Sequence, residues 1–294
     1  MTPHALRSCD TLGVVRNRLP ILGLTLLLAA CGSGTIRDFE DAASGRDAAT
    51  ARDAATGWDA ATGPDAATGP DAATGVVPPL GGSSGGSGGA TLPSGQWQTA
   101  GSVSYLLIVP SSYSQSTPSR LMIVYSGTEG AQTMGQNLLG AGPSVGLGDV
   151  IFAVLDGTTY YGNGQAGATV LDDVRARYNI DNDRTFLLSE SAGTSAGLQL
   201  GLQLRQSYFA AYWANDVNAS ATPTKTAAQL GFAPWGNAGP GGDYADANAI
   251  VSGMQTAGYR LPADAPYSGT GADTHGSPQQ FLAALQFYSG KSRN

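Results

Sequence analysis

Residues 96–294 predict a doubly wound α/β fold built on a mostly parallel sheet. Their apolar runs are short and continuous, which favours strands that are buried on both faces. Segments with helical periodicity separate these runs, and strands that alternate with helices form a sheet covered by helices on both sides. One of the strands also leads directly into a tight, serine-containing turn that is followed by a helix.

Six apolar runs give the expected strands, at residues 105–109, 121–125, 150–155, 186–188, 208–214 and 232–235. Turn-forming residues bound each of them. In open α/β sheets the ligand site lies at the carboxyl ends of the strands. At that edge we therefore expect to find Ser126, Asp156, Ser191, Asp216 and the glycine-rich loop 236–242.

Four segments are expected to be helical, at residues 170–178, 194–206, 244–258 and 278–288. The first has aspartates at its start and arginines at its end, an order that suits the helix dipole. The third closes at a glycine, and the last carries an apolar stripe on one face. A weaker segment around Leu138 is expected to include a short helix.

Residues 1–30 are expected to be a cleaved leader rather than part of the fold. Arginines are followed by an apolar run of ten residues, 21–30, which is too short to span a bilayer. A basic region, a short apolar region and small residues before the cleavage site define a secretory signal peptide. The sequence Leu28-Ala29-Ala30-Cys31 resembles the bacterial lipobox. The resemblance implies a lipoprotein signal peptide, with lipid on Cys31 holding the protein on a membrane of the cell envelope, outside the cytoplasm.

Residues 31–95 are expected to form a disordered, low-complexity tether. Aspartate recurs every six residues, mostly in a hexad of Asp-Ala-Ala-Thr-Gly plus one variable residue, at Asp41, Asp47, Asp53, Asp59, Asp65 and Asp71. Six matches neither the helix nor the strand period, and the repeat has almost no large apolar side chain with which to build a core. The run of glycine and serine at 81–89 reads as a flexible linker.

Charge and composition exclude several classes of function. Residues 96–294 contain nine Lys/Arg and thirteen Asp/Glu, so their net charge is −4 and no basic patch is available for nucleic acid. Of the two cysteines, Cys9 is lost with the leader and Cys31 is committed to lipid. One histidine remains after cleavage, so neither a disulfide nor a zinc site is expected, and no cofactor is implied.

The segment Ser189-Glu190-Ser191-Ala192-Gly193 joins an expected strand to an expected helix. A serine in such a turn, flanked by small residues, is typical of the nucleophile elbow of serine hydrolases. A serine hydroxyl needs a base, and the only histidine of the chain outside the leader is His275. Ser191 and His275 are therefore the candidate nucleophile and general base. The alternative is a simple helix cap at Ser191.

The segment from Tyr105 to His275 resembles the α/β-hydrolase superfamily. It is most similar to secreted esterases grouped with polyhydroxybutyrate depolymerases and feruloyl esterases. The resemblance is carried by residues 105–113, by 121–127 and, most specifically, by Arg-Tyr-Asn-Ile-Asp-Asn-Asp-Arg at 177–184. It implies hydrolysis of carboxylic esters through an acyl-enzyme, with an oxyanion hole made by the backbone amides of Ala192 and Thr128.

The chain departs from this family at three positions. Ser126 stands where the family has the histidine of His-Gly, and Ser189 replaces the first glycine of the elbow. Gly239 occupies the place of the aspartate that completes the triad. Asp243, the carboxylate nearest to the expected loop, is the first candidate for the acid, with Asp216 and then Asp246 as alternatives.

Two functions follow from these observations. The first is a membrane-tethered serine esterase that acts on a small-molecule or polymeric ester. The second is a non-catalytic surface or binding lipoprotein that retains the fold, and the departures at Ser126 and Gly239 favour it.

Overall fold

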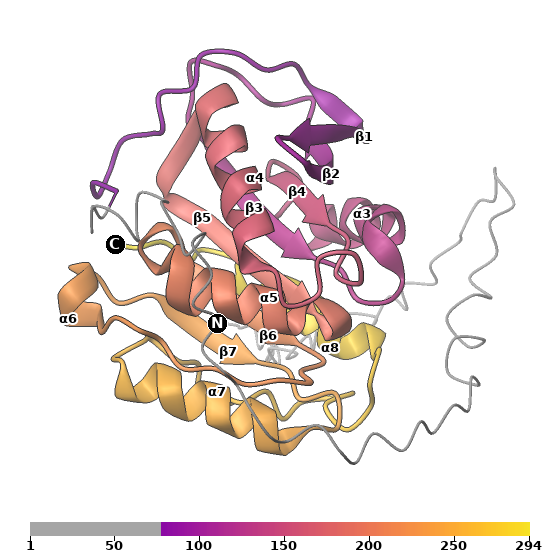
Figure 1. The fold of residues 1–294 in the computed structure, drawn as a ribbon, viewed down its shortest axis with the longest axis vertical. Coiled ribbons are helices and arrows are strands. Elements are labelled where there is room, and N and C mark those ends of the chain that lie inside the picture. The colour runs from indigo at the N-terminus through magenta and orange to yellow at the C-terminus, as the bar shows by residue number, and fades with distance from the viewer. Residues whose placement is uncertain (1–77) are drawn as a thin grey trace, which may run out of the picture. The chain divides into compact units, whose positions relative to one another are not determined.

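The computed structural model describes residues 78–294, so the leader, Cys31 and the hexads lie outside the described residues. These residues form a seven-stranded sheet with the strand order β1-β2-β4-β3-β5-β6-β7 (Figure 1). β3 to β7 are mutually parallel, whereas β1 and β2 add an antiparallel hairpin at one edge. The strands are β1 Leu92–Ala100, β2 Val103–Val109, β3 Ser119–Tyr125, β4 Ile151–Leu155, β5 Ile180–Glu190, β6 Ala211–Asn215 and β7 Trp235–Ala238.

Helices cover both faces of the sheet, as the continuous apolar strands predict. α4, α5 and α7 pack on one face, and α3 and α8 pack on the other. The α-helices are α3 Gly130–Ala141, α4 Gly164–Arg177, α5 Thr194–Gln199, α6 Ala227–Leu230, α7 Tyr244–Thr256 and α8 Pro278–Phe287. The 3₁₀-helices are η1 Gly142–Val145, η2 Ser191–Gly193 and η4 Gln206–Tyr208, and η3 Leu200–Leu204 is a π-helix. Among the residues that the structure describes, no helix is both long and apolar enough to cross a membrane.

The strand alternation divides the core into two layers. In β3, Leu121, Ile123 and Tyr125 belong to the layer under α4 and α5, whereas Met122 and Val124 belong to the layer under α3 and α8. All five side chains are fully buried. Because successive side chains of a strand point to opposite faces, a strand enclosed by two helical layers must be apolar at every position. The doubly wound α/β prediction is therefore confirmed.

Several expected elements have different limits in the structure. β5 begins at Ile180, so residues 180–185 extend the strand that was expected only at 186–188. The helix expected at 194–206 is divided between α5 and the π-helix η3. β7 starts at Trp235, where the expected strand ends.

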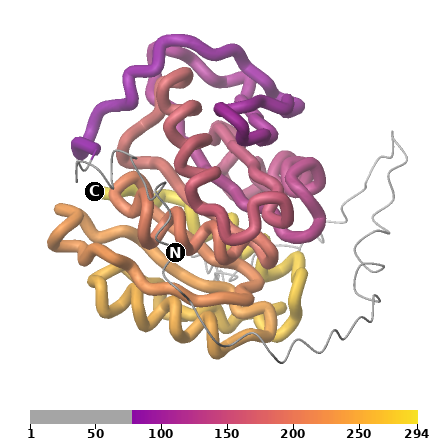
Figure 2. The backbone as a smooth tube through the Cα atoms, viewed as in Figure 1, coloured from indigo at the N-terminus to yellow at the C-terminus, as the bar shows by residue number. Residues whose placement is uncertain are grey.

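The domain begins earlier than residue 96, the boundary that composition predicts. Residues 81–84 lie beside the start of β5 and residues 86–90 lie against Arg177 and Tyr178, just before that strand. Figure 2 shows this segment as the indigo start of the coloured tube. The Ser84 amide donates to the Ile180 carbonyl at 2.8 Å, and β1 follows from Leu92. A Cβ on Gly86 would lie 2.3 Å from the Tyr178 carbonyl oxygen, and one on Gly89 would lie 2.3 Å from the Tyr178 ring. These glycines serve close packing, so the expectation of a flexible linker at 81–89 is wrong.

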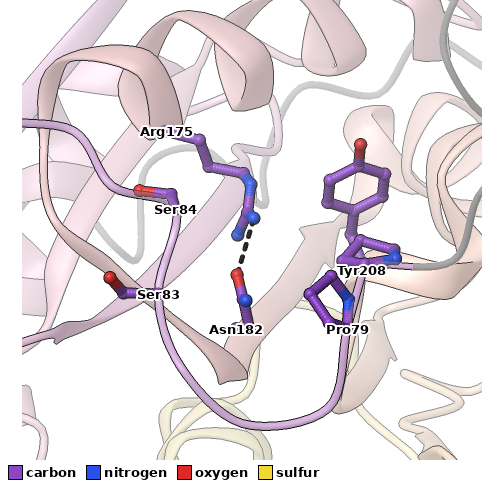
Figure 3. Close-up of a pocket in the computed structure, with 7 residues that line it drawn as sticks. Pro79, Ser83, Ser84, Arg175, Asn182 and Tyr208 are labelled. Carbon is purple, nitrogen blue, oxygen red and sulfur yellow. Dashed lines mark hydrogen bonds between the residues drawn. The ribbon is translucent and has the colours of Figure 1, made fainter.

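A pocket of about 280 Å³ lies between this N-terminal segment and the fold. Pro79, Ser83 and Ser84 of this segment line it together with Arg175 and Asn182, which are joined by a 2.8 Å hydrogen bond (Figure 3). It adjoins the start of β5, whereas Ser191 follows the end of that strand. The pocket is therefore separate from the edge of the sheet where the candidate site is expected.

Candidate active site

Ser191 occupies a strained turn between β5 and α5. Its φ is +46°, in the left-handed region that non-glycine residues seldom adopt, and Asp216 is the only other non-glycine with positive φ in residues 78–294. A Cβ on Gly193 would lie 2.6 Å from the Ser126 carbonyl oxygen. The turn therefore requires a residue without a side chain at 193. Strain of this kind costs about 1–3 kcal/mol and gathers at functional sites.

His275 lies in the loop before α8, opposite the serine. Ser191 Oγ and His275 Nε2 are 2.9 Å apart, within hydrogen-bond distance, although 84 residues separate them in the chain. Ser191 is half-buried and His275 is exposed, so solvent reaches the pair. A serine hydroxyl that contacts an accessible imidazole has the geometry required for activation by a general base.

Ser126 has a structural role at the end of β3. Its side chain is fully buried, and its hydroxyl donates to the Gly127 carbonyl and accepts from the Gly157 amide at 3.1 Å. It thereby joins the loop after β3 to the loop after β4. A Cβ on Gly157 would lie only 1.8 Å from the Ser126 carbonyl oxygen, so the two loops approach as closely as backbone allows.

Ser189, the second departure from the family, fits because α5 supplies a matching glycine. A Cβ on Gly197 would lie 2.4 Å from the Ser189 Cβ. The Ser189 hydroxyl also hydrogen-bonds with the Tyr212 hydroxyl at 2.9 Å. The serine in the strand is thus accommodated by the glycine in the helix, and the elbow keeps its close packing.

The space next to Gly239 explains the third departure. A Cβ at this position would lie 2.5 Å from Asn215 Oδ1 and 2.8 Å from the Gln280 amide carbon. A Cβ on Gly241 would lie 2.3 Å from Asp216 Oδ1. The space that side chains of this loop would need is therefore filled by the polar side chains of Asn215, Asp216 and Gln280.

Asp216 lies at the carboxyl end of β6 with φ +48° and no exposed surface. Its Oδ2 accepts from the Gly276 amide at 2.7 Å, and its Oδ1 accepts from Gln280 Nε2 at 2.6 Å. Gly276 directly follows His275. The carboxylate of Asp216 therefore holds the backbone of the loop that carries the histidine.

Asp243, the first choice from the sequence, is engaged elsewhere. It is the N-cap of α7, and its Oδ1 accepts from the Asp246 amide at 3.1 Å. Its loop does touch the histidine loop, since the Gly242 amide donates to the Ala272 carbonyl at 2.9 Å. Among the described residues, however, neither Asp243 nor Asp246 has a side-chain hydrogen bond to the histidine loop. The geometry favours Asp216, the second choice, over Asp243.

The two amides expected to bind an oxyanion lie near the serine. Ala192 is in the first turn of η2, where helix geometry leaves amides without a backbone partner. Gly127 packs against Ser191, because a Cβ on it would lie 3.2 Å from the Ser191 Cβ. Its amide donates to Glu129 Oε1 at 2.9 Å and is thus engaged within the loop, and Thr128 is the next residue along the chain.

Carboxyl groups dominate the electrostatics of the site. Glu129, Asp156, Glu190 and Asp216 all follow or end strands at this edge, and within residues 78–294 no lysine or arginine pairs with any of them. Burial and then repulsion by Asp216 raise the pKa of Glu190 well above its usual range. Withdrawal from water, with smaller contributions from Asp156 and Asp216, raises the pKa of Glu129.

No group of three or more His, Cys, Asp and Glu suited to a metal ion occurs in the described part of the chain. Sequence reasoning did not foresee the roles of Ser126 or Gln280, or the packing of Gly197 against Ser189. All three places lie at or beside positions 126, 189 and 239, where the sequence departs from the pattern of the esterases that it resembles.

The fold is shared with known esterases. No protein-family model and no curated protein matches this sequence. Among solved structures, a thermostable esterase has a TM-score of 0.51 at 12% identity, over 68% of this chain and 63% of that one.

Two other similar structures have lower TM-scores. The thermophilic carboxylesterase EstE1, from a metagenomic library, has a TM-score of 0.47 at 12% identity, over 66% of this chain and 85% of that one. The poly(3-hydroxybutyrate) depolymerase LpqC from Bordetella parapertussis has a TM-score of 0.44 at 16% identity, over 62% of this chain and 88% of that one. This chain spans 63% of the thermostable esterase, less than two-thirds of its length, and at 12% identity what the two proteins share is the fold.

Proposed function

We propose that this protein is a serine esterase that hydrolyses carboxylic esters through an acyl-enzyme on Ser191. The observation that supports this most directly is the 2.9 Å contact between Ser191 Oγ and His275 Nε2, on a serine held at φ +46°. A purely capping serine would not need an imidazole partner. The esterase-like fold agrees with the proposal.

In the proposed reaction, His275 Nε2 takes the hydroxyl proton as Ser191 Oγ attacks the ester carbonyl. The amides of Ala192 and Thr128 hydrogen-bond to the developing oxyanion, an effect worth about 100- to 1000-fold per donor. The imidazolium then protonates the leaving alcohol. Water, deprotonated by the same imidazole, hydrolyses the acyl-serine and regenerates the enzyme.

We assign the orienting acid to Asp216 rather than Asp243. Its buried carboxylate accepts from the amide next to His275, and its negative charge favours the imidazolium that forms in the reaction. The acid thus follows β6 instead of β7. Gly239 then needs no side chain, because Asn215, Asp216 and Gln280 fill the space around its loop.

The proposal includes a lipid anchor on Cys31 that holds the enzyme in the cell envelope, outside the cytoplasm, and it depends on the lipobox-like sequence alone. Incorporation of labelled palmitate into the expressed full chain tests it, with Cys31→Ser as the matched control. Equal labelling of the two proteins would refute the anchor.

Hydrolysis of 4-nitrophenyl acetate and butyrate by the purified protein tests the chemistry. We expect turnover that disappears in Ser191→Ala and persists in Ser195→Ala, a control serine one helical turn further on. A fluorophosphonate should label the wild type and Ser195→Ala but not Ser191→Ala. A folded protein that neither turns over nor labels would favour the non-catalytic binding lipoprotein.

A further inference from the structure

Gln280, in the first turn of α8, is a buried polar side chain whose amide is engaged at both ends. It has no exposed surface. Its Nε2 donates to Asp216 Oδ1 at 2.6 Å, and its Oε1 accepts from the Gly241 amide at 3.2 Å. These partners fix the orientation of the amide, because the reverse one would set an oxygen against a carboxylate and an NH₂ group against an N–H donor. Gln280 therefore joins α8 to the segments that follow β6 and β7.

The local sequence of α8 predicts a different use for this side chain. Ser277 is the N-cap and Gln280 is the third helical residue, the spacing at which a glutamine side chain closes a capping box on the N-cap backbone. The helix α6 has the same spacing and does close the box, because the Thr226 amide donates to Gln229 Oε1 at 2.8 Å. In α8 the glutamine amide is directed to Asp216 instead. Helix capping therefore does not explain the position of the Gln280 side chain.

The carboxylate of Asp216 depends on the donors that surround it. It is fully buried, and no lysine or arginine of residues 78–294 forms an ion pair with it. A buried charge without an ionic partner is strongly unfavourable unless hydrogen bonds compensate it. In this part of the chain its donors are the Gly276 amide, on Oδ2 at 2.7 Å, and Gln280 Nε2, on Oδ1. One of the two donors is thus supplied by Gln280.

The two donors together fix the plane of the carboxylate. A carboxylate with one donor can rotate about its Cβ–Cγ bond, whereas donors on both oxygens, from separate segments, prevent that rotation. Because Gly276 directly follows His275, Oδ2 is the oxygen that faces the histidine loop. In the proposed reaction His275 becomes an imidazolium, and the carboxylate has to keep this orientation while the charge forms. Small displacements of such a group lower the rate steeply.

We propose that Gln280 is a positioning residue, which holds Asp216 Oδ1 so that Oδ2 stays directed to the His275 loop. The inference rests on the proposed function, with Asp216 as the acid. Gln280 acts through Asp216 and, being fully buried, does not touch the substrate. The Gly241 amide occupies Gln280 Oε1 and thereby keeps the NH₂ group turned toward the carboxylate.

A double-mutant cycle tests the proposal, with kcat and KM for 4-nitrophenyl acetate at pH 7 as the readout. It combines Gln280→Met, which fills nearly the same space without donating a hydrogen bond, with Asp216→Asn. We expect Gln280→Met alone to lose at least about tenfold, in kcat rather than KM, because a hydrogen bond to a charged group is lost. In the Asp216→Asn background the same substitution should change kcat by less than about threefold, since the carboxylate on which it acts is absent. Equal losses in the two backgrounds would overturn the proposal.

Gln286→Met is the matched control, because Gln286 is exposed on the same helix, and it should behave as wild type. Gln280→Glu covers the case in which Gln280→Met does not fold. Its carboxyl group can donate to Asp216 only while it is protonated. The kcat/KM of this variant relative to wild type should therefore fall as pH rises from about 5 to 8. A ratio that is constant over this range would contradict the positioning role.

Urea unfolding of the four proteins of the cycle does not require activity. We expect the losses of stability at positions 216 and 280 to be non-additive, because the two side chains are in direct contact. Additive losses would refute the contact on which the proposal rests. If unfolding shows the coupling but the wild type shows neither turnover nor fluorophosphonate labelling, then the esterase proposal fails, and with it the catalytic role of Gln280, while the contact stands.

Discussion

The assignment of the acid predicts opposite outcomes for Asp216→Asn and Asp243→Asn. Asp216 has no exposed surface and accepts donors on both carboxylate oxygens, at 2.7 and 2.6 Å. Asparagine keeps one acceptor and turns an NH₂ group toward the other donor. The substitution thus loses at least one charge-assisted hydrogen bond, worth about 1.5–3 kcal/mol.

The activity loss should exceed the stability loss. Replacing the triad acid of a serine protease by its amide lowers kcat about 10⁴-fold. A destabilisation of about 2 kcal/mol lowers Tm by only about 4–8 °C in a domain of this size. Asp243→Asn should change little, because asparagine caps helices as well as aspartate does and retains the acceptor for the Asp246 amide.

The assay is kcat/KM for 4-nitrophenyl acetate at pH 7, beside Tm from differential scanning fluorimetry. We expect Asp216→Asn to lose at least about 10³-fold while remaining folded, and Asp243→Asn to stay within about threefold. The reverse order would refute the argument from hydrogen bonding and restore Asp243 as the acid.

Four further outcomes follow from described contacts. Arg293→Ala breaks a largely buried ion pair with Asp183 and should cost about 3–5 kcal/mol of unfolding free energy, measured in urea; a loss under 1 kcal/mol would contradict this. Gly197→Ala should cost about 1–3 kcal/mol through its clash with Ser189, and Ser189→Gly in the same chain should recover most of it. The raised pKa of Glu190 means that its contribution to stability is complete below about pH 4.3 and is lost as pH rises through the folded value, so Tm of Glu190→Gln relative to wild type should increase from pH 4 to 8. Because carboxylates without cationic partners surround the serine, an ester bearing a carboxylate should have a lower kcat/KM than its neutral isostere, by a factor that shrinks as salt is added.

The sequence was sufficient for the architecture because local patterns determine it. Continuous apolar runs identify strands enclosed on both faces, and β3 and β4 match their expected limits within one or two residues. Elimination brought Ser191 and His275 together as candidates, and the structure places them 2.9 Å apart. These inferences needed only periodicity and the scarcity of histidine.

The acid and the start of the domain depend on contacts between distant parts of the chain. Asp216 is distinguished from Asp243 by Gln280, which is 64 residues away from it and has no recognisable signature. The composition of residues 81–89 is typical of a linker and so predicts flexibility at Gly86 and Gly89. In the structure, glycine is required there because the backbone lies so close to Tyr178. A glycine needed for packing and a glycine in a free linker look the same in sequence.

The two ends of the described domain meet at one buried side chain. Arg293 donates to the carbonyls of Pro78 and Pro79 and pairs with Asp183, near the start of β5. Ser191 follows the other end of that strand, about 26 Å away at the usual rise of a strand. Coupling the chain through Asn294 to a bead or an electrode should thus put the attachment point at the end of β5 that lies opposite to the serine.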